Sequence, residues 1–326
     1  MQAPAAPATG RLTVEIIVPC YNEGEGIEGF HSQLSQSLEK LPYAFIIRYV
    51  DDGSTDRTAE ALAGIAARDE RVGIIELSRN FGHQAALSAG LDASQADATI
   101  TMDGDGQHPV EMIGEMIAAF AQGFDIVLMQ RREDRGASPF KRLTSETFYR
   151  GLNLIADTRL VPGAADFRLL SRRVVDGLRE LPEHHRFLRG MIAWMGYRTA
   201  ILPYSSRERL VGRSKYSLRK MLRLAMDATF SFSLVPLYLG VFLGILFIGL
   251  GVAEAIYVGS LWLGGRYESL APGWSSLMFM LLIVGGTLST ILGILGIYVG
   301  YIFQEVKRRP SYFIRSKGGR SDPGGR

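Results

Sequence analysis

Two long apolar runs in the last third of the chain constrain its fold more than any other feature. Residues 233–258 carry one charged side chain, Glu254, and residues 274–303 carry none. About 20 apolar residues are enough for a helix to cross the hydrocarbon layer of a membrane. A buried helical hairpin of a soluble protein is the alternative, but uncharged runs of this length are rare in soluble cores. The sequence therefore predicts a two-helix transmembrane anchor over residues 233–304.

The charges that flank these runs predict their orientation. Basic residues cluster on both outer sides, at Arg219, Lys220 and Arg223 before the first run and at Lys307, Arg308, Arg309, Arg315 and Lys317 after the second. The connection between the runs, residues 259–273, is short and nearly balanced in charge. Because positive residues stay preferentially on the cytoplasmic side, both termini and the large amino-terminal part of the chain are predicted to face the cytoplasm.

The composition excludes several classes of protein. The net charge of +3 and the lack of a basic stripe interleaved with aromatic residues argue against nucleic-acid binding. Cys20 is the single cysteine, so a disulfide within the chain or a thiolate zinc cluster is not available, and we interpret it as a packing residue. At the ends of the chain, residues 1–11 are predicted to be a disordered tail and residues 305–326 a basic cytoplasmic tail, of which residues 316–326 are predicted to be loose.

The segment before the first apolar run, residues 207–232, combines a basic loop with a helical pattern. Its apolar residues recur at helical spacing, at Leu218, Met221, Leu222, Leu224 and Ala225. The basic residues fall on the rest of the helical wheel, which is typical of a helix that lies on anionic lipid headgroups. A surface helix of the soluble domain is the alternative.

Apolar runs of strand length recur in the amino-terminal part, and each is followed by a segment with helical spacing. The runs are residues 14–18, 45–50, 72–77, 98–102 and 125–129. This alternation predicts an α/β domain over residues 12–206, with a mostly parallel sheet covered by helices on both faces. Ligands of such folds bind beyond the carboxyl ends of the strands. Polar, glycine-containing loops follow all five runs, so we expect a site at this edge.

The loop after the fourth run, DGDGQHP, concentrates negative charge on a flexible backbone. Gly104 separates Asp103 from Asp105, and Gly106 follows Asp105. A calcium-binding EF-hand loop is excluded, because the positions that need glycine and glutamate hold His108 and Gly114. A solvated turn stays open as an alternative. Two hard oxygen ligands, with Gln107 able to add a third, favour Mg²⁺ or Mn²⁺ shared with a phosphate. His108 could also bind the metal, but because Pro109 follows it we interpret it as the start of the next helix.

The loops after the first and second runs offer groups for binding a nucleotide. Asp51 and Asp52 can accept hydrogen bonds from a base or a ribose. Ser54, Thr55 and Asp56 are interpreted instead as caps of the following helix. The stretch PCYNE, residues 19–23, adds an aromatic face and a carboxylate at the end of the first run.

Together these motifs resemble a known family. VPCYNE, VDDGSTD and the D-x-D of MDGDGQHP, in this order, are similar to the family-2 inverting glycosyltransferases of the GT-A fold. SRNFGH, ADFRLLSR, RFLRGMIAWMGY and RERLVGRSKYS, followed by two spans, extend the resemblance to the polyprenyl-phosphate glycosyltransferases over residues 12–309. Gly106 stands where many of these relatives have leucine, a difference that leaves the carboxylates in place.

The resemblance implies a role for each matching residue. It implies a nucleotide pocket lined by Pro19, Tyr21, Glu23, Asp51, Asp52 and Asp103. It implies a divalent cation, Mg²⁺ or Mn²⁺, held against the diphosphate by Asp103, Asp105 and Gln107. It implies phosphate or acceptor binding by Arg131 and by Arg213, Ser214 and Lys215 of the GRSKY loop. The residues with catalytic roles are then Asp105, Arg131 and Asp166.

Asp166 stands where the family has a candidate catalytic base. The second pKa of a phosphate monoester lies near 6, so an acceptor of this kind is already largely ionised at neutral pH. It needs positioning more than deprotonation. We therefore interpret Asp166 first as a residue that orients an arginine or the acceptor, and second as a general base.

The resemblance implies a multi-pass enzyme of the bacterial inner membrane, and a homo-oligomer, with a tetramer favoured. It would move a sugar from a nucleotide donor, UDP-sugar rather than GDP-sugar, to a polyprenyl phosphate such as undecaprenyl phosphate on the cytoplasmic face. A processive polysaccharide synthase is one alternative, but it would carry a Q-x-x-R-W motif and more spans. A catalytically silent nucleotide-sugar-binding membrane protein is the other, against which the intact D-x-D motif and Asp166 argue.

Overall fold

One mixed β-sheet organises the part of the chain that carries the predicted site. The computed structural model describes residues 11–132, 161, 163–181, 183, 186–205, scattered positions from 237 to 265, and 273–319. The described strands are β1 (Thr13–Cys20), β2 (Ala44–Asp51), β3 (Val72–Leu77), β4 (Ala98–Thr101), β5 (Ile126–Arg131), β6 (Ala164–Ser171), β7 (Thr199–Tyr204) and β8 (Ile314–Gly319). The described helices are α1 (Ile27–Leu38), α2 (Thr58–Arg68), α3 (His83–Ala93), the short η1 (Val110–Met112), α4 (Ile113–Ala121), α6 (Arg172–Glu180), α7 (Leu188–Trp194) and α10 (Trp274–Lys307).

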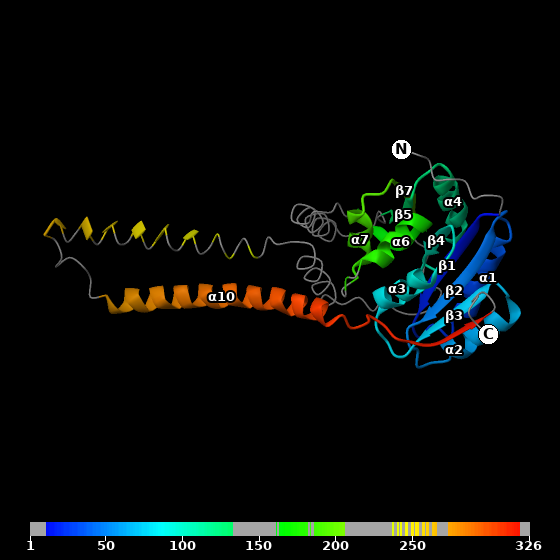
Figure 1. Cartoon of the computed structure of the whole chain (residues 1–326), viewed down its shortest axis with the longest axis horizontal. Coiled ribbons are helices and arrows are strands. Elements are labelled where there is room, and N and C mark those ends of the chain that lie inside the picture. Colours follow the sequence, from blue (N-terminus) through cyan, green and yellow to red (C-terminus); the bar gives the residue numbers. More distant parts are fainter. Residues whose placement is uncertain are drawn as a thin grey trace. The chain divides into compact units, whose positions relative to one another are not determined.

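The strands lie in the order β7-β5-β6-β4-β1-β2-β3-β8 (Figure 1). β4, β1, β2 and β3 are parallel neighbours, and β5 is parallel to β7. β6 lies between β4 and β5 and is antiparallel to both. The five strands expected from the sequence are confirmed, and β5 still runs in the direction of β4. Their carboxyl ends therefore share one edge of the sheet, and the amino end of the reversed strand β6 reaches the same edge.

Helices cover both faces of this sheet, as the sequence predicts. On one face, α1 buries residues spaced by three or four positions, Ile27, Phe30, Leu34 and Leu38, among the alternate side chains of β1. On the other face, α3 packs against β1 and β2. Gly90 of α3 approaches β1 so closely that an added Cβ would lie 2.4 Å from Cγ2 of Ile17. The absence of a side chain at Gly90 therefore sets the distance between α3 and the sheet.

Three strands were not expected from the sequence. In β6, residues 166–171 are all buried, but the charged residues Asp166 and Arg168 alternate with Phe167 and Leu169, so the strand shows no long apolar run. β7 is short and largely exposed at the edge of the sheet. β8 lies in the predicted basic tail, and the prediction that the end of the tail is loose is wrong for residues 316–319, which pair with β3. In Figure 1 this red segment lies along β3.

The chain divides into two compact units, residues 1–221 with 309–326, and residues 222–308. In the second unit, the stretch Ile283–Lys307 of α10 is long and apolar enough to cross a membrane, and it is the one such helix found among the described residues. The first predicted span, residues 233–258, falls largely outside the described residues, and its described positions are helical. Residues 207–232 lie wholly outside them. The two-helix anchor therefore stays a prediction.

The close approach of α3 predicts opposite effects for two glycine-to-alanine substitutions. Gly90→Ala should lower the free energy of unfolding by about 1–3 kcal/mol, because buried Ile17 has no space to move into. Gly64→Ala, in α2, has only the end of Arg68 within 4 Å and should be neutral or stabilising by up to about 1 kcal/mol, because alanine favours a helix. Thermal denaturation of the purified full chain measures both, and equal stability of the two variants would contradict this packing.

Candidate active site

The turn after β2 is held by its own carboxylates. Asp51 accepts hydrogen bonds at Oδ1 from the backbone N–H (3.0 Å) and the hydroxyl (2.5 Å) of Ser54. Asp52 accepts the backbone N–H of Phe81 at Oδ1 (2.7 Å) and that of Gly82 at Oδ2 (2.9 Å). Burial raises the pKa of Asp52, and these two N–H groups offset part of that rise. Asp52 therefore fastens the loop after β3, at the start of α3, to the end of β2.

The predicted helix caps in this turn need correction. Ser54 accepts the backbone N–H of Asn22 (3.0 Å), and the side chain of Asn22 accepts the backbone N–H of Thr55 (2.9 Å). Ser54 and Thr55 therefore connect the loop after β2 to the loop after β1, and neither of them caps α2. Asp56 does bind the backbone N–H of Thr58 in the first turn of α2 (3.0 Å). The capping interpretation therefore holds for Asp56 alone.

The D-x-D loop after β4 is shaped by a buried histidine. His108 accepts the backbone N–H of Asp103 at Nδ1 (2.9 Å), and its ring stacks on Phe167 of β6 with centroids 4.9 Å apart. His108 precedes η1 and supports the loop, so the interpretation that it starts a helix is wrong. Asp105 accepts the backbone N–H of Gln107 (3.0 Å). The loop is thus held by hydrogen bonds from its own backbone N–H groups to the side chains of His108 and Asp105, and the Asp103 side chain is about one-third exposed.

A buried ion-pair cluster surrounds Asp166 at the amino end of β6. Arg189 of α7 donates to both of its carboxylate oxygens, Nε to Oδ1 at 3.1 Å and Nη2 to Oδ2 at 2.9 Å. Arg168, two residues along β6, also donates to Oδ1. The side-chain amide of Gln84 in α3 lies 3.4 Å from Oδ2. The Asp166 carboxylate therefore accepts hydrogen bonds from residues of β6, α3 and α7.

These donors determine the charge of Asp166. Burial alone would raise the pKa of this carboxyl, but the positive charges of Arg189 and Arg168, with hydrogen bonds from His83 and Arg189, hold it well below its ordinary value. A general base works best when its pKa lies near the working pH. A carboxylate with so low a pKa is a poor proton acceptor at neutral pH. This electrostatic environment favours the interpretation of Asp166 as an orienting residue.

His83 connects the D-x-D loop to this cluster. Its Nε2 lies 3.5 Å from Oδ1 of Asp103 and 3.5 Å from Oδ2 of Asp166. Burial lowers the pKa of His83, but the hydrogen bond to Asp166 and the charges of Asp103 and Asp166 outweigh burial, so the pKa is raised. His83, Arg168 and Arg189 were not singled out from the sequence. The signal available was their position in the SRNFGH, ADFRLLSR and RFLRGMIAWMGY motifs.

The remaining predicted residues lie at the same strand ends or outside the described part. Tyr21 follows β1 and is exposed, and the backbone N–H of Glu23 binds the Thr58 hydroxyl (2.9 Å). Pro19 is the next-to-last residue of β1, opposite Val50 of β2, and Arg131 ends β5. Cys20 is buried in the core, which agrees with a packing role. The predicted acceptor residues Arg213, Ser214 and Lys215 lie outside the described residues.

The carboxylates of the D-x-D loop are suited to a divalent cation that is shared with a bound phosphate. Within the described residues, no group of three or more histidine, cysteine, aspartate or glutamate side chains is arranged to bind a metal. Mg²⁺ and related cations commonly use one or two protein carboxylates and complete their shell with phosphate oxygens and water. The pair Asp103 and Asp105 fits that kind of site.

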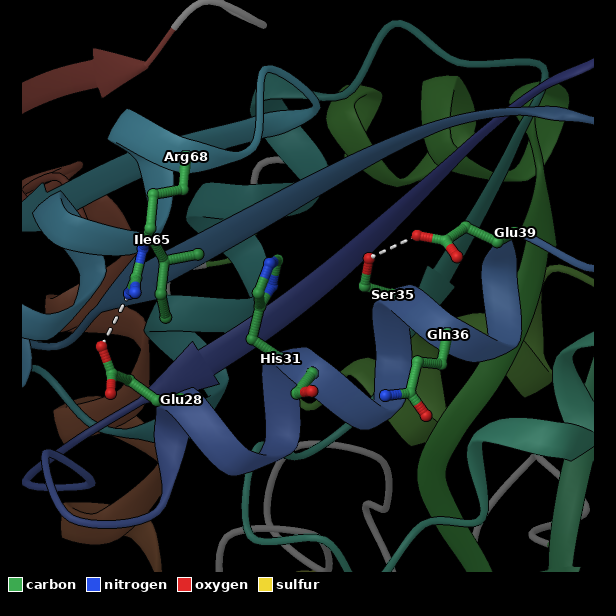
Figure 2. Close-up of a pocket in the computed structure, with 8 residues that line it drawn as sticks. Glu28, His31, Ser35, Gln36, Glu39, Ile65 and Arg68 are labelled. Carbon is green, nitrogen blue, oxygen red and sulfur yellow. Dashed lines mark hydrogen bonds and ion pairs between the residues drawn. The ribbon is translucent and has the colours of Figure 1, made fainter.

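A separate depression lies along α1 and α2 (Figure 2). It has a volume of about 450 Å³ and is open to solvent. Side chains of α1 line it together with Ile65 and Arg68 of α2, and an ion pair joins Arg68 to Glu28 at 2.8 Å. None of the predicted site residues lines it, so we do not assign it to the active site.

Comparison with known proteins defines the class of this chain. Residues 15–179 match glycosyl transferase family 2. The uncharacterized glycosyltransferase YkcC of Bacillus subtilis (strain 168) is 38% identical over 308 residues, covering 94% of this chain and 95% of that protein. The bactoprenol glucosyl transferase of Shigella phage SfII is 35% identical over 315 residues, covering 96% of this chain and 100% of that protein. The chain therefore belongs to glycosyl transferase family 2.

Family membership makes the chain a glycosyltransferase with a GT-A-like α/β fold. Relatives named bactoprenol glucosyl transferases, which match nearly the whole chain, are consistent with the polyprenyl-phosphate subgroup. Among solved structures, mannosyl-3-phosphoglycerate synthase from Rubrobacter xylanophilus is similar at 17% identity with a TM-score of 0.46, covering 80% of this chain and 78% of that one.

The Asp166 cluster predicts a pH-dependent effect of removing Arg189. A carboxyl whose pKa is lowered by folding stabilises the folded chain above its unfolded pKa, near 3.9, and this contribution is lost as the pH falls through the folded pKa. Arg189→Ala should raise the folded pKa of Asp166. The melting temperature of this variant should therefore lie below that of the wild type at neutral pH.

The difference should narrow as the pH falls through the raised pKa of Asp166 in the variant and on towards its lower pKa in the wild type, because the carboxyl loses its charge first in the variant and last in the wild type. Arg68→Ala removes an exposed ion pair and serves as the control, with little change expected at any pH. A difference for Arg189→Ala that stays constant with pH would show that this arginine stabilises the fold by packing alone.

Proposed function

We propose that this glycosyltransferase moves a hexose from a nucleotide sugar, UDP-glucose in the simplest case, to undecaprenyl phosphate at the cytoplasmic face of a bacterial inner membrane. The observation that carries the proposal is the juxtaposition of Asp103, His83 and the Asp166–Arg189 pair at one edge of the sheet. Carboxylates for a cation-bound diphosphate and arginines for a phosphate are thereby adjacent. The nearly full-length relatives named bactoprenol glucosyl transferases support the choice of acceptor.

The donor side of the proposed site consists of the loops after β1, β2 and β4. Pro19, Tyr21, Glu23, Asp51 and Asp52 would line the nucleotide pocket. Asp103, Asp105 and Gln107 would hold a divalent cation, which when bound neutralises charge on the departing diphosphate. Because hydrogen bonds to the side chains of His108 and Asp105 hold the D-x-D loop, its carboxylates would need little rearrangement when the donor arrives.

The side of the site that we assign to the acceptor carries positively charged arginine side chains. Arg189 and Arg168 are oriented by Asp166, and Arg131 stands at the end of β5. Guanidinium groups bind phosphate oxygens in a fixed, two-pronged geometry. We assign the approach of the acceptor phosphate to this side, where Arg213, Ser214 and Lys215 would add further contacts. Asp166 would keep the arginines in place for a nucleophile that is already ionised.

In the proposed reaction, an oxygen of the acceptor phosphate attacks the anomeric carbon of the sugar. The new carbon–oxygen bond forms while the bond from that carbon to the nucleotide diphosphate breaks, and its electron pair stays on the diphosphate. A single displacement of this kind inverts the anomeric configuration. The protein contributes alignment of the two phosphorylated ligands and stabilisation of the charge that moves between them.

The proposal places the enzyme at the membrane surface that holds its acceptor. The chain of a polyprenyl phosphate stays in the hydrocarbon layer, so the active site has to reach the headgroups. The apolar stretch of α10 supports membrane attachment. The basic, amphipathic residues 207–232 would lie on the headgroups, and residues 233–258 would form the first of the two spans.

A transfer assay tests the function. The purified full chain, incubated with UDP-glucose, Mn²⁺ and undecaprenyl phosphate in detergent, should produce glucose-linked lipid with inverted configuration. Asp105→Ala or chelation of the cation should reduce the rate by a factor on the order of 100 or more, because the leaving diphosphate loses its counter-charge. Glu115→Ala, an exposed carboxylate on α4, is the control. Transfer that proceeds at the wild-type rate in chelator would contradict the cation-assisted mechanism, and no lipid product from any UDP-sugar would contradict the proposed function.

Labelling of introduced cysteines tests the topology. On a background with Cys20→Ala, Ser269→Cys should react with a membrane-impermeant thiol reagent from the periplasmic side only. Lys317→Cys, exposed on β8, should react from the cytoplasmic side only. Cytoplasmic labelling at both positions would contradict two membrane crossings.

A further inference from the structure

The chain returns from α10 to the sheet of the first unit. Six residues, 308–313, separate the end of α10 from β8, which pairs antiparallel with β3. The hydroxyl of Ser316 donates to Oε2 of Glu76 on β3 at 2.7 Å, in addition to the backbone pairing. The edge of the sheet that bears β3 is therefore completed by residues that follow the apolar helix.

The same C-terminal segment binds the loop after β3, residues 78–82. The backbone N–H of Ser78 donates to the carbonyl of Phe313 (2.8 Å), and Nη2 of Arg315 donates to the carbonyl of Ser78 (3.0 Å). The ring of Phe313 lies 6.2 Å from that of Phe81, centroid to centroid. Both backbone polar groups of Ser78 are thus satisfied by the C-terminal segment.

The opposite side of this loop rests on the turn after β2. Asp52 accepts the backbone N–H groups of Phe81 and Gly82. Gly53 has a positive φ of 66°, and an added Cβ there would lie 2.4 Å from the carbonyl carbon of Arg79. The loop is therefore packed between the proposed nucleotide pocket and the C-terminal segment, and it leads directly into His83.

A second contact fixes the far end of α3. The hydroxyl of Tyr312 donates to Oδ2 of Asp92 in the last turn of α3 at 2.8 Å. Arg186, three residues before Arg189, binds the same carboxylate at 2.8 and 2.9 Å. Burial and the neighbouring Asp92 raise the pKa of Tyr312, so its hydroxyl stays protonated and able to donate.

We propose that residues 312–316 act as a positioning strap: Tyr312 and Arg315 hold the loop at 78–82 and helix α3, and so set the geometry of Asp52 and His83. Nucleotide affinity then depends on a segment that follows α10 in the chain and whose side-chain hydrogen bonds go to Glu76, Ser78 and Asp92, outside the proposed pocket. This consequence for nucleotide binding rests on the proposed function, whereas the effect on the loop follows from the contacts alone.

The double variant Tyr312→Phe with Arg315→Ala tests the strap in the purified full chain. It removes the two side-chain hydrogen bonds and keeps the aromatic ring. Hydrogen exchange at the amides of Phe81 and Gly82 should accelerate, because the loop can leave Asp52 more often. The dissociation constant of UDP, measured calorimetrically with Mn²⁺, should rise roughly three- to tenfold, as expected for the loss of one or two hydrogen bonds.

Two controls separate positioning from general damage. Lys317→Ala removes the same charge from an exposed site on β8 and should leave both measurements unchanged. Restoring a donor with Arg315→Lys should recover part of the affinity. Amide hydrogen exchange in β1 and β4 of the double variant should stay as slow as in the wild type. That result would show that the sheet is intact.

Unchanged exchange at Phe81 and Gly82 together with unchanged UDP affinity in the double variant would overturn the strap. If the wild type itself binds no UDP, the proposed donor is wrong. Hydrogen exchange at Phe81 and Gly82 would still test whether residues 312–316 hold the loop. Faster exchange in the double variant would then uphold the strap, and unchanged exchange would overturn it.

Discussion

The site depends on one buried negative charge, the carboxylate of Asp166. A buried charge is costly unless it is paired and hydrogen-bonded. Here Arg189 and Arg168 supply the pairing, and their charges keep the carboxyl ionised. The same carboxylate faces His83, whose other neighbour is Asp103. Removing a member of this group would leave another charge uncompensated, so the two sides of the site form one electrostatic unit.

The sheet topology makes this unit possible. Parallel strands β2 and β4 deliver acidic loops to one edge, which suits a cation and a diphosphate. The reversed strand β6 starts at that edge and brings a carboxylate with its arginines. Helix α3 spans the middle, from His83 at the site to Asp92 at the Tyr312 contact. Residues from the beginning, middle and end of the chain thus together determine the geometry of the site.

The sequence predicts the strands whose apolar runs contain at most one charged residue, β1 to β5, and the position of the D-x-D loop. It does not predict β6, because the charged residues that build the site interrupt its apolar pattern. Nor does it predict β8, whose pairing with β3 is provided by a distant part of the chain. Ser54 and Thr55 have the residue types of helix caps, yet they bind Asn22, whose positive φ of 54° turns it towards them. His83 and Arg189 gain their roles only through tertiary contacts with Asp166.

The central claim is that Asp166 orients positive groups around an acceptor that is already ionised. The most direct test is the pH dependence of transfer with two acceptors, undecaprenyl phosphate and the corresponding phosphonate, whose second pKa is higher. If Asp166 only orients, the acidic limb of the rate profile follows the acceptor, lying near pH 6 for the phosphate and moving to higher pH for the phosphonate. An acidic limb at the same pH for both acceptors would assign proton removal to the enzyme and contradict the account.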